Sequence, residues 1–597
     1  MKLLQHNGVM VYPKYESQGY SVKIKGKLHS LKPREEERII AWAKKIGTPY
    51  VEDPVFASNF HLDLSELMGF KILPGDIDYS EIHADIVAER AYKKSLSREE
   101  KKKLAADRKV IREANKEKYG YVIMDGVRCE LGNYMVEPSS IFMGRGEHPL
   151  RGRWKEGPRH KDIILNHSKD VSQPEGDWKN IVWDPESIWI AKWKDKLSGK
   201  MKYVWPHDSS PIKQMNDVKK YDKAIELRRN IGKVKKFIHK NLTHEELKRR
   251  KTATVCYLIN ELKFRVGDEK DDDEADTVGA SSLRSEHIYF NKDGSVTFDF
   301  LGKDSVRLTL TEELDPKVVE NLKEFMKSSK GDTLFAEVNS SVVSEFLDEV
   351  MEGITAKMFR TYYATEAVES KLNSLNVKDT APDYSKKHFA TLANLEAAKI
   401  CNHRRTRSES WKNRLVRQKE RLKDRKARAR KNKRKYKQRI KDTRKRYTER
   451  VTRYETKLSD DKVTLKEYKQ TLIERKELDK SVKGITKRIA SKKRVIKNGR
   501  KRIRKTKKKR RELIAKLKER MANRARKDKA GIEKAKLRIE AKELTQDYNL
   551  GTSLKSYIDP RVYYEWGVKV DYDWKNYYSK ALRKKFSWVD PEPSTDV

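Results

Sequence analysis

Lysine and arginine side chains are concentrated in one internal stretch of this sequence, where their charges could bind a polyanion. Residues 401–550 contain 60 Lys and Arg against 19 Asp and Glu, a net charge of +41 out of +47 for the 597 residues. The rest of the chain is nearly neutral, and a patterned segment follows the basic stretch. This arrangement suggests that a large body and a small C-terminal piece act together on a polyanion, with nucleic acid as the first candidate.

Two other partners fit such a basic chain, a ribosome-type assembly and an anionic membrane surface. A helix that binds a membrane surface needs an apolar face opposite its Lys and Arg side chains. Residues 421–428, by contrast, are basic all round. Nucleic acid is therefore favoured over a membrane.

Cysteine and histidine patterns predict no metal or disulfide site. Cys129, Cys256 and Cys401 are far apart, odd in number and form no CxxC pair, and the 13 histidines form no HExxH motif. The chain also has no GxxxxGK[ST] loop, and it shows no signal-peptide start and no apolar run long enough to cross a membrane. We expect an intracellular, reduced protein with no metal and no cofactor.

The first part of the chain has the pattern of a mixed α/β region. Residues 33–45 and 98–119 predict helices, the second begun by a capping box with Ser97 at the N-cap. Residues 121–129 predict a β-hairpin with a tight turn at Asp125-Gly126. Residues 188–193 and 202–205 predict two paired strands.

The next region, up to about residue 405, is more helical. An apolar helix is expected at 252–264, followed directly by Arg265. Residues 286–310 predict a three-stranded meander that places Lys303 at a hairpin tip. Further helices are expected at 355–370, carrying Arg360, and at 387–401, with His403 just beyond its end.

The basic stretch favours helix because it is rich in Lys, Arg, Glu and Ala and contains no proline between 406 and 545. Apolar residues recur at heptad-like spacing in 447–458 and again in 485–503. Two such arms predict an antiparallel helical hairpin, whose tip could lie at 460–461, at 481–484 or at 498–499. A partly disordered basic linker is the alternative.

Several strings, in order along nearly the whole chain, resemble the type IB DNA topoisomerases, the eukaryotic topoisomerase I enzymes and their archaeal relatives. They are GRGEHP at 144–149, RVGDEK at 265–270, ADTVG at 275–279, SLRSEHI at 282–288, FDFLGKDS at 298–305, TAKMFRTY at 355–362, CNH at 401–403, LGTS at 550–553 and YIDPR at 557–561. Each string alone is weak evidence, but the ordered set is specific. The resemblance implies relaxation of positive and negative DNA supercoils without ATP or an obligatory metal.

By this resemblance Tyr557 is the nucleophile that forms a 3′-phosphotyrosine. A free phenol has a pKa near ~10, so only about one in a thousand is ionised at pH 7, and nearby cations are needed. Arg265 and Arg360 match the arginines that bind the phosphate, and His403 matches the histidine that also contacts it. Lys303 matches the lysine that protonates the departing 5′-oxygen.

Without the resemblance, these residues have simpler interpretations. Arg265 would form a salt bridge or a helix cap, His403 would interact with a helix dipole, and Lys303 would be a solvated turn residue. The resemblance also implies six DNA contacts, made mainly to phosphates. They are Arg145, Lys202, Lys270, Thr277, Arg284 and Lys357.

The implied fold class is an α+β multidomain protein that forms a bilobed DNA clamp. We expect a mixed α/β N-terminal DNA-binding lobe at 1–215, and at 216–405 a mainly helical catalytic domain of tyrosine recombinase/topoisomerase IB type. A long basic antiparallel coiled-coil linker should follow at 406–545, and at 546–597 a small helical C-terminal domain carrying the tyrosine. The basic linker is expected to slow DNA rotation between cleavage and religation.

Two positions depart from the usual eukaryotic pattern. Ser556 replaces the Asn that usually precedes the tyrosine, and Asp268 replaces another Asn. A carboxylate is unfavourable beside a phosphate, so we expect Asp268 to point away from DNA or to pair with Lys270. The chain also starts almost at the core, which suggests an archaeal member: a monomer located in the cytoplasm with the nucleoid, or in the nucleus if the source is a eukaryote.

Two other functions fit parts of this pattern. A tyrosine site-specific recombinase shares the fold and the order of catalytic residues, but recombinases usually have His where Lys357 stands and lack a long basic hairpin. A non-catalytic architectural DNA-binding protein would keep the scaffold without the covalent chemistry.

Overall fold

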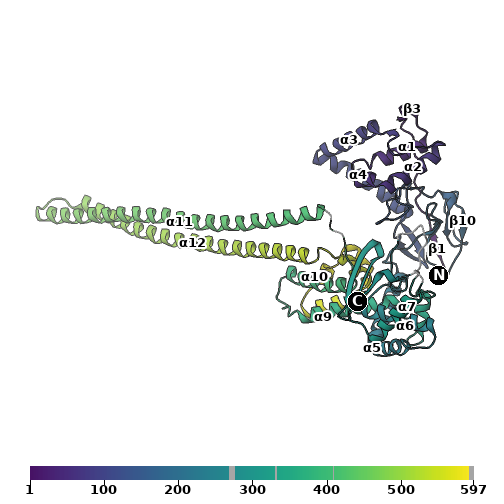
Figure 1. The fold of residues 1–597 in the computed structure, drawn as a ribbon. Helices are drawn as coiled ribbons and strands as arrows, with labels where there is room; N and C mark the ends of the chain where they lie inside the picture. The colour runs from purple at the N-terminus through teal and green to yellow at the C-terminus, as the bar shows by residue number, and fades with distance from the viewer. Residues whose placement is uncertain (268–275, 330–332, 406, 408, 591–597) are drawn as a thin grey trace. The chain divides into compact units, whose positions relative to one another are not determined.

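The computed structural model describes residues 1–267, 276–329, 333–405, 407 and 409–590 (Figure 1). The chain divides into two compact units. The first contains Met1–Thr380, Ala393–Arg405 and Tyr548–Val597, and the second contains Ala381–Leu392 and Thr406–Asp547. The first unit is therefore assembled from segments that lie on both sides of the basic stretch.

The N-terminal part of the first unit combines small sheets with four helices. The sheets have the strand orders β3-β2-β4, β1-β5-β6, β7-β8 and β10-β9-β11-β12. The strands are β1 (Leu4–His6), β2 (Ser21–Ile24), β3 (Lys27–Ser30), β4 (Ile77–Asp78), β5 (Tyr121–Met124), β6 (Val127–Glu130), β7 (Ser140–Ile141), β8 (Trp154–Lys155), β9 (Ile163–Asn166), β10 (Asn180–Val182), β11 (Ala191–Lys194) and β12 (Met201–Val204). The helices are α1 (Pro33–Ala43), α2 (Pro54–Met68), α3 (Ser80–Ser95) and α4 (Arg98–Tyr119).

Local sequence signals explain several of these elements. The Ser97 hydroxyl accepts from the Glu100 N–H at 3.2 Å, and the Glu100 carboxylate accepts from the Ser97 N–H at 2.8 Å, so the predicted capping box begins α4. Asp125 and Gly126 both have positive φ, at 48° and 82°, as the tight turn between β5 and β6 requires. The predicted pairing of β11 with β12 is also confirmed.

The second part of the first unit is mainly helical and contains the predicted meander. Its helices are α5 (Pro211–Asn241), α6 (Leu247–Leu262), α7 (Pro316–Ser328), α8 (Ser340–Asp348), α9 (Ala356–Ser374) and α10 (Asp383–Ile400), of which α10 continues from the second unit. The meander consists of β13 (Ile288–Phe290), β14 (Val296–Gly302) and β15 (Val306–Glu312), paired in the order β13-β14-β15. A 3-10 turn at Lys303–Ser305 joins β14 to β15, so Lys303 lies at the hairpin tip as predicted.

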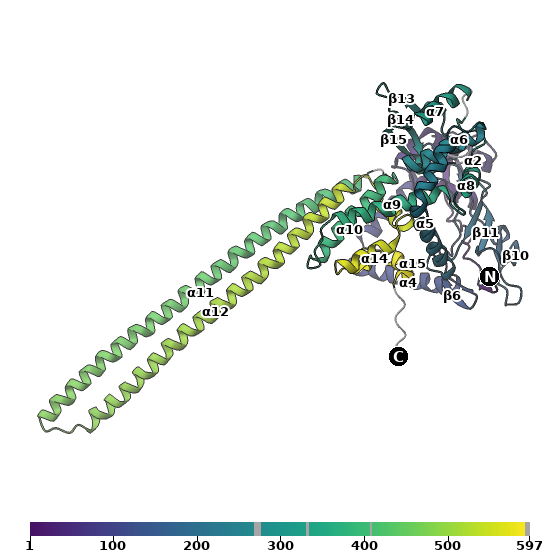
Figure 2. The same cartoon turned by 90° about the horizontal axis from the view of Figure 1, so that it is seen from below.

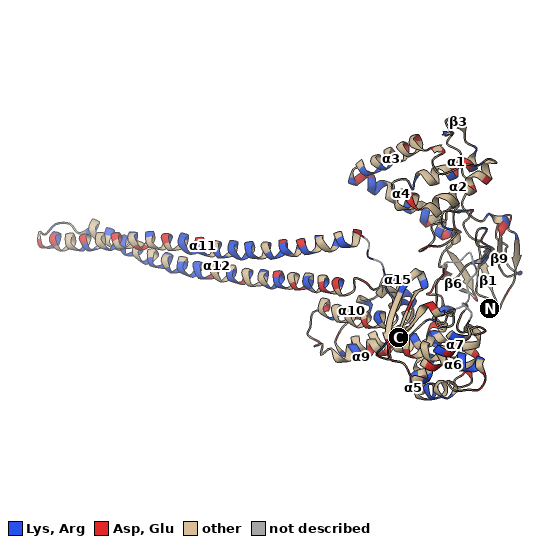
Figure 3. Cartoon of the chain, in the orientation of Figure 1, with Lys and Arg blue, Asp and Glu red and all other residues tan. Residues whose placement is uncertain are grey.

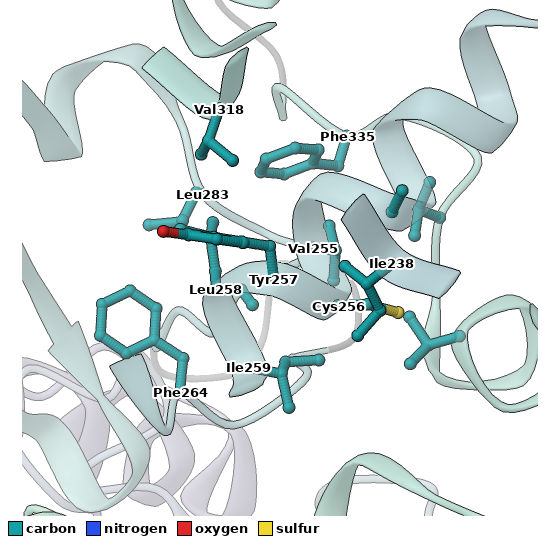
Figure 4. Close-up of a cluster of buried hydrophobic side chains, with 14 of the residues drawn as sticks. Ile238, Val255, Cys256, Tyr257, Leu258, Ile259, Phe264, Leu283, Val318 and Phe335 are labelled. Atoms are coloured by element: carbon teal, nitrogen blue, oxygen red, sulfur yellow. The ribbon is translucent and has the colours of Figure 1, made fainter. Parts of the chain in front are cut away.

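Helix α6 is the centre of the core in this region (Figure 4). Val255 and Leu258 are fully buried, and Phe264, just beyond the helix, packs edge to face on Phe298 of β14 at 5.3 Å. Burial of one such aliphatic side chain contributes about 1.5–3 kcal/mol. The backbone that leads into Arg265 is therefore held between a buried helix and a sheet.

The second unit is dominated by two long helices that run side by side in opposite directions (Figure 2). They are α11 (Glu409–Glu477) and α12 (Lys483–Leu544), joined at residues 478–482. The pairs Lys419–Glu543 at 2.6 Å and Lys507–Glu455 at 2.6 Å connect the helices at two levels. Apolar side chains are buried along the seam, among them Tyr447, Val451, Ile489, Ile496 and Ile503.

The connection between α11 and α12 decides between the three predicted tips. It lies next to the predicted position at 481–484. Asp460 and Asp461 lie inside α11, and Asn498 and Gly499 lie inside α12. Lys and Arg residues recur along the length of both helices (Figure 3).

After the second unit the chain returns to the first and forms three short helices. These are α13 (Leu550–Ser556), α14 (Pro560–Lys569) and α15 (Lys580–Lys585). Tyr563, Tyr578 and Phe586 are almost fully buried and anchor this segment. None of the described helices is both long and apolar enough to cross a membrane.

Candidate active site

Tyr557 lies in a turn fixed by helix caps on both sides. Asn549 caps α13 by accepting from the Gly551 N–H, and Asp559 caps α14 by accepting from the Arg561 N–H. The Tyr557 N–H donates to the Ser553 carbonyl at 3.0 Å, and the side chain is 5 % exposed. Local hydrogen bonds therefore shape the backbone around Tyr557, and its side chain is buried within the first unit.

Arg265 contacts the phenol directly. It follows α6, whose C-cap residue Lys263 has a left-handed φ of 59°, and its Nη1 donates to the Tyr557 hydroxyl at 3.3 Å. Burial, followed by the charge of Arg360, lowers the pKa of Arg265. A guanidinium still stays protonated at working pH, so Arg265 keeps a positive charge next to the phenol oxygen.

Arg360 lies over the face of the tyrosine ring. It projects from α9, is 4 % exposed, and its guanidinium carbon is 5.2 Å from the centroid of the Tyr557 ring. Its Nη1 donates to the Lys263 carbonyl at 2.6 Å, and its Nη2 donates to the Cys401 carbonyl at 2.5 Å. Its Nε is buried and has no hydrogen-bond partner among the described residues.

His403 completes the group of side chains around Tyr557. It follows α10, its ring centroid is 5.1 Å from that of Tyr557, and its Nε2 is 3.4 Å from the Arg360 Nη2. Its Nδ1 is 2.6 Å from the Ser553 hydroxyl. Burial, with the charges of Arg360 and Arg265, lowers the pKa of His403 to about 3. The imidazole is therefore neutral at pH 7.

The tautomer of His403 follows from its neighbours. Arginine only donates hydrogen bonds, so Nε2 accepts from Arg360 and the proton lies on Nδ1, facing Ser553. An anion that draws the Arg360 guanidinium to itself would free Nε2 and raise the local preference for a protonated ring.

Lys303 faces the same cavity as Arg265, Arg360 and His403. This cavity has a volume of about 100 Å³, and its lining includes the cations Lys263, Arg265, Lys303, Arg360 and Arg404. None of the described residues that line it is acidic. Arg360 is buried and Arg265 is half-buried. Removing such charges from water without a carboxylate partner is costly, so the cavity is suited to bind an anion with several oxygens, such as a phosphodiester.

A second, larger cavity brings together three of the predicted residues. Arg145, Thr277 and Lys303 line a space of about 620 Å³, together with His148 and Lys155. Gly146 has a positive φ of 58°, and a side chain there would collide with Ser305, so the glycine lets the two loops approach closely. Lys303 lines both cavities, which connects this space to the phosphate-binding candidates.

The other predicted DNA contacts lie apart from these cavities. Arg284 pairs with Asp276 at 2.7 Å and with Glu286 at 2.8 Å, so its charge already has protein partners. Lys202 lies on β12, and Lys357 is exposed in the first turn of α9. Lys270 lies outside the described residues, and so does Asp268.

Ion pairs connect the tyrosine-bearing segment to the start of α5. Lys555 lies 3.0 Å from Asp208, Lys585 lies 2.9 Å from Asp217, and Arg561 lies 2.7 Å from Asp222. Burial would raise the pKa of Asp208, but Lys555 and Lys585 outweigh it, and the pKa lies below its ordinary value. These pairs contribute to holding α13–α15 on the first unit.

Sequence reasoning missed some residues that shape the site. Ser553, which contacts His403, lies in the LGTS string four residues before the tyrosine, so the spacing on α13 could have indicated it. The carbonyls of Lys263 and Cys401, which orient Arg360, have no sequence signal because any residue supplies a carbonyl.

The chain is similar to one family along most of its length. Residues 1–206 match the model for eukaryotic DNA topoisomerase I, DNA binding fragment, residues 209–440 match the catalytic core of the same enzyme, and residues 529–595 match the C-terminal topoisomerase domain.

Individual relatives carry the same description. DNA topoisomerase 1 beta of Arabidopsis thaliana is 38% identical over 420 residues, which cover 68% of this chain and 45% of the relative. DNA topoisomerase 1 of Candidozyma auris is 36% identical over 422 residues (68% and 56%), and that of Homo sapiens is 34% identical over 437 residues (70% and 56%). The matches span about half the length of these relatives.

Proposed function

Because the chain belongs to the eukaryotic-type DNA topoisomerase I family, the type IB DNA topoisomerases, we propose that it relaxes DNA supercoils of both signs. The Tyr557 oxygen attacks a phosphodiester, forms a 3′-phosphotyrosine and releases a 5′-hydroxyl. The free strand rotates, and the 5′-hydroxyl then attacks the phosphotyrosine and restores the DNA. Each step exchanges one phosphodiester for another, so no ATP is consumed.

The cavity lined by cations beside the phenol is the observation that carries this proposal. Arg265 and Arg360 bind the non-bridging oxygens of the phosphate, and the unpartnered Nε of Arg360 is one donor for them. The same charges stabilise the additional negative charge of the five-coordinate phosphorus. His403 adds a hydrogen bond, and Lys303 protonates the departing 5′-oxygen.

The finer architecture belongs to the same proposal. The first 215 residues and residues 216–405 form the two lobes of a clamp around double-stranded DNA, 406–545 form a coiled-coil linker, and 546–597 form the C-terminal domain. Arg145, Lys202, Lys270, Thr277, Arg284 and Lys357 contact DNA. The protein acts as a monomer at the DNA, in a nucleoid or in a nucleus.

If about ten phosphates are contacted, the log–log dependence of DNA affinity on salt has a slope of roughly −9.

The decisive experiment is relaxation of supercoiled plasmid in EDTA by the wild type and by Tyr557→Phe. The wild type should relax positive and negative supercoils, and denaturant should trap it covalently on the 3′ end of the cut strand. The Tyr557→Phe variant should bind DNA but do neither. Equal relaxation by both proteins would refute the nucleophile assignment, and a strict need for Mg²⁺ or ATP would refute the mechanism.

The same assay separates the competing functions. A site-specific recombinase would need its own site sequence and a paired complex of two sites. An architectural protein would change DNA shape without a covalent adduct.

A further inference from the structure

The proposed nucleophile and the cations around it are far apart in the sequence. Arg265 and Tyr557 are in hydrogen-bond contact although 292 residues separate them, and the whole of the second unit intervenes. The chain itself therefore does little to fix the phenol, and non-covalent contacts between the C-terminal segment and the rest of the first unit must set its position.

Thr365 of α9 contacts the backbone of the nucleophile from another segment of the chain. Its hydroxyl donates to the Tyr557 carbonyl at 3.3 Å and accepts from the Asp559 N–H at 3.1 Å. One side chain thus satisfies two backbone groups on either side of Ile558, which is fully buried.

This bonding is unusual for a threonine inside a helix. Helical threonines commonly donate to the carbonyl four residues earlier, and Thr252, Thr361 and Thr391 of this chain do so. Thr365 directs its hydroxyl across to another segment instead. The Thr365 hydroxyl therefore connects two segments of the chain, whereas the other three hydroxyls bond within their own helices.

The helix that carries Thr365 also carries Arg360. Five residues along an α-helix correspond to about 7.5 Å, so one rigid element holds both a phosphate-binding arginine and the backbone of the nucleophile. The ion pairs at Asp208, Asp217 and Asp222 use long lysine and arginine side chains with many rotatable bonds, which tolerate small shifts. The Thr365 side chain is short, and its hydroxyl bonds two backbone groups, at 3.3 and 3.1 Å.

We infer that Thr365 is a positioning residue, which sets the distance between the Tyr557 oxygen and the phosphate held by Arg360. This inference rests on the proposed function. A nucleophile must lie about 3–3.5 Å from the atom it attacks, and a displacement of 1 Å can cost about 10²-fold in rate. Removal of the hydroxyl should therefore slow the chemistry while DNA binding is preserved.

The test is single-turnover cleavage of a DNA duplex whose cleaved end cannot be resealed. Thr365→Val keeps the side-chain shape and removes the hydroxyl, and we expect cleavage about 10- to 100-fold slower. Thr365→Ser keeps the hydroxyl and should cleave within about threefold of the wild type. Thr252→Val is the matched control, because it removes a buried helical hydroxyl of the same unit that bonds only within α6.

Three further measurements separate positioning from a general loss of structure. DNA affinity, measured in the Tyr557→Phe background, should change less than about twofold on adding Thr365→Val. Religation should slow as much as cleavage, because the same distance governs both directions. Thermal unfolding should be shifted similarly by the valine variants at 365 and 252. If Thr365→Val does not fold, Thr365→Ala replaces it in the same comparison.

The outcomes are distinct. Wild-type cleavage rates in Thr365→Val, or an equal defect in Thr365→Ser, would overturn the positioning role, as would a cleavage defect fully explained by weaker DNA binding. A wild type that forms no covalent adduct would refute the proposed function itself.

Discussion

The proposed catalytic cavity and the helical hairpin both contain positive charge, but in different surroundings. Among the cations that line the cavity, Arg360 is 4 % exposed and Lys263 and Arg265 are half-buried, whereas Lys303 and Arg404 are exposed. The basic stretch holds most of the net charge, on lysines and arginines that are mainly exposed and that recur along both long helices (Figure 3). Most of the net positive charge therefore lies on the helical hairpin, whereas the few charges expected to act on the chemistry lie in the cavity.

Burial explains the difference. Two charges 4 Å apart interact by about 4 kcal/mol at an effective dielectric constant of 20, and by about 1 kcal/mol in water. Solvated charges are also screened over about 8 Å at physiological salt. We expect the buried cations to control chemistry at any salt concentration, and the hairpin to control an attraction that fades as salt rises.

The largest effect should follow from loss of a buried cation. Arg360→Ala removes a proposed phosphate ligand and the donor that bonds the carbonyls of Lys263 and Cys401. We expect single-turnover cleavage to fall by about 10²–10³-fold, with the salt dependence of DNA binding almost unchanged. Arg360→Lys should recover little, because an ammonium lacks the two-pronged geometry. If Arg360→Ala lowered the cleavage rate by less than about fivefold, the buried cations would not control the chemistry as this comparison requires.

Shortening the hairpin should change the salt dependence of DNA binding and leave the cleavage rate almost unchanged. Deletion of 428–455 together with 505–532 removes matched lengths of α11 and α12 and keeps the junctions with the first unit. If the removed part contacts about three phosphates, the salt slope becomes shallower by about 2.7, a relative change of about 40-fold in affinity between 50 and 200 mM salt. Cleavage of saturating DNA should stay within about twofold.

Rotation provides a second measurement on the shortened protein. If the hairpin slows rotation, the variant should remove more supercoils in each cleavage event. Unchanged rotation and unchanged salt dependence would reduce the hairpin to a tether.

Burial of His403 should make the folding stability depend on pH. Its pKa is about 3 in the folded protein and about 6.5 when unfolded, so the unfolded chain binds the extra proton between these values. Folding stability should therefore fall as the pH drops below about 6.5, by about 2 kcal/mol from this residue at pH 5. Chemical denaturation at pH 7 and pH 5 should show a smaller pH effect in His403→Gln than in the wild type. Equal pH effects in the two proteins would contradict a buried, neutral His403.

The smallest effect should come from the ion pairs of the C-terminal segment. Asp208→Asn weakens the contact with Lys555, which is 56% exposed, so a contribution below about 1 kcal/mol is expected. Cleavage should slow about two- to fivefold at low salt and return towards the wild-type rate as salt rises. Asp76→Asn, which disrupts the exposed pair with Lys25, is the control. A defect that persists at high salt would place Asp208 with the buried group instead.

The elements that carry the site could be predicted from sequence because their signals are local. The position of Lys303 follows from alternating apolar residues between two turns, and the start of α4 follows from the capping box at Ser97. Motif strings then indicated which residues belong together. The hairpin tip could not be chosen, because all three candidates combine residues of low helix propensity, and only contacts between α11 and α12 distinguish them.

Contacts between segments that are distant in the sequence could not be predicted, because no local sequence pattern indicates them. The hydrogen bond from Thr365 to Tyr557 joins residues 192 positions apart, and nothing distinguishes Thr365 from Thr361 in the sequence. The buried, neutral state of His403 depends on two arginines brought to it by folding. Exposed charge can be counted from composition, whereas the effect of buried charge depends on its neighbours.

The connectivity of the first unit also orders events during biosynthesis. A ribosome makes Arg265, Lys303, Arg360 and His403 first, then the two long helices, and only then Tyr557. A nascent chain can therefore fold the α6 core and attract nucleic acid well before it contains the group that would cut a strand. By the proposed mechanism, the distance in sequence between Tyr557 and the cations also means that the chain cannot cut DNA until translation has passed the hairpin.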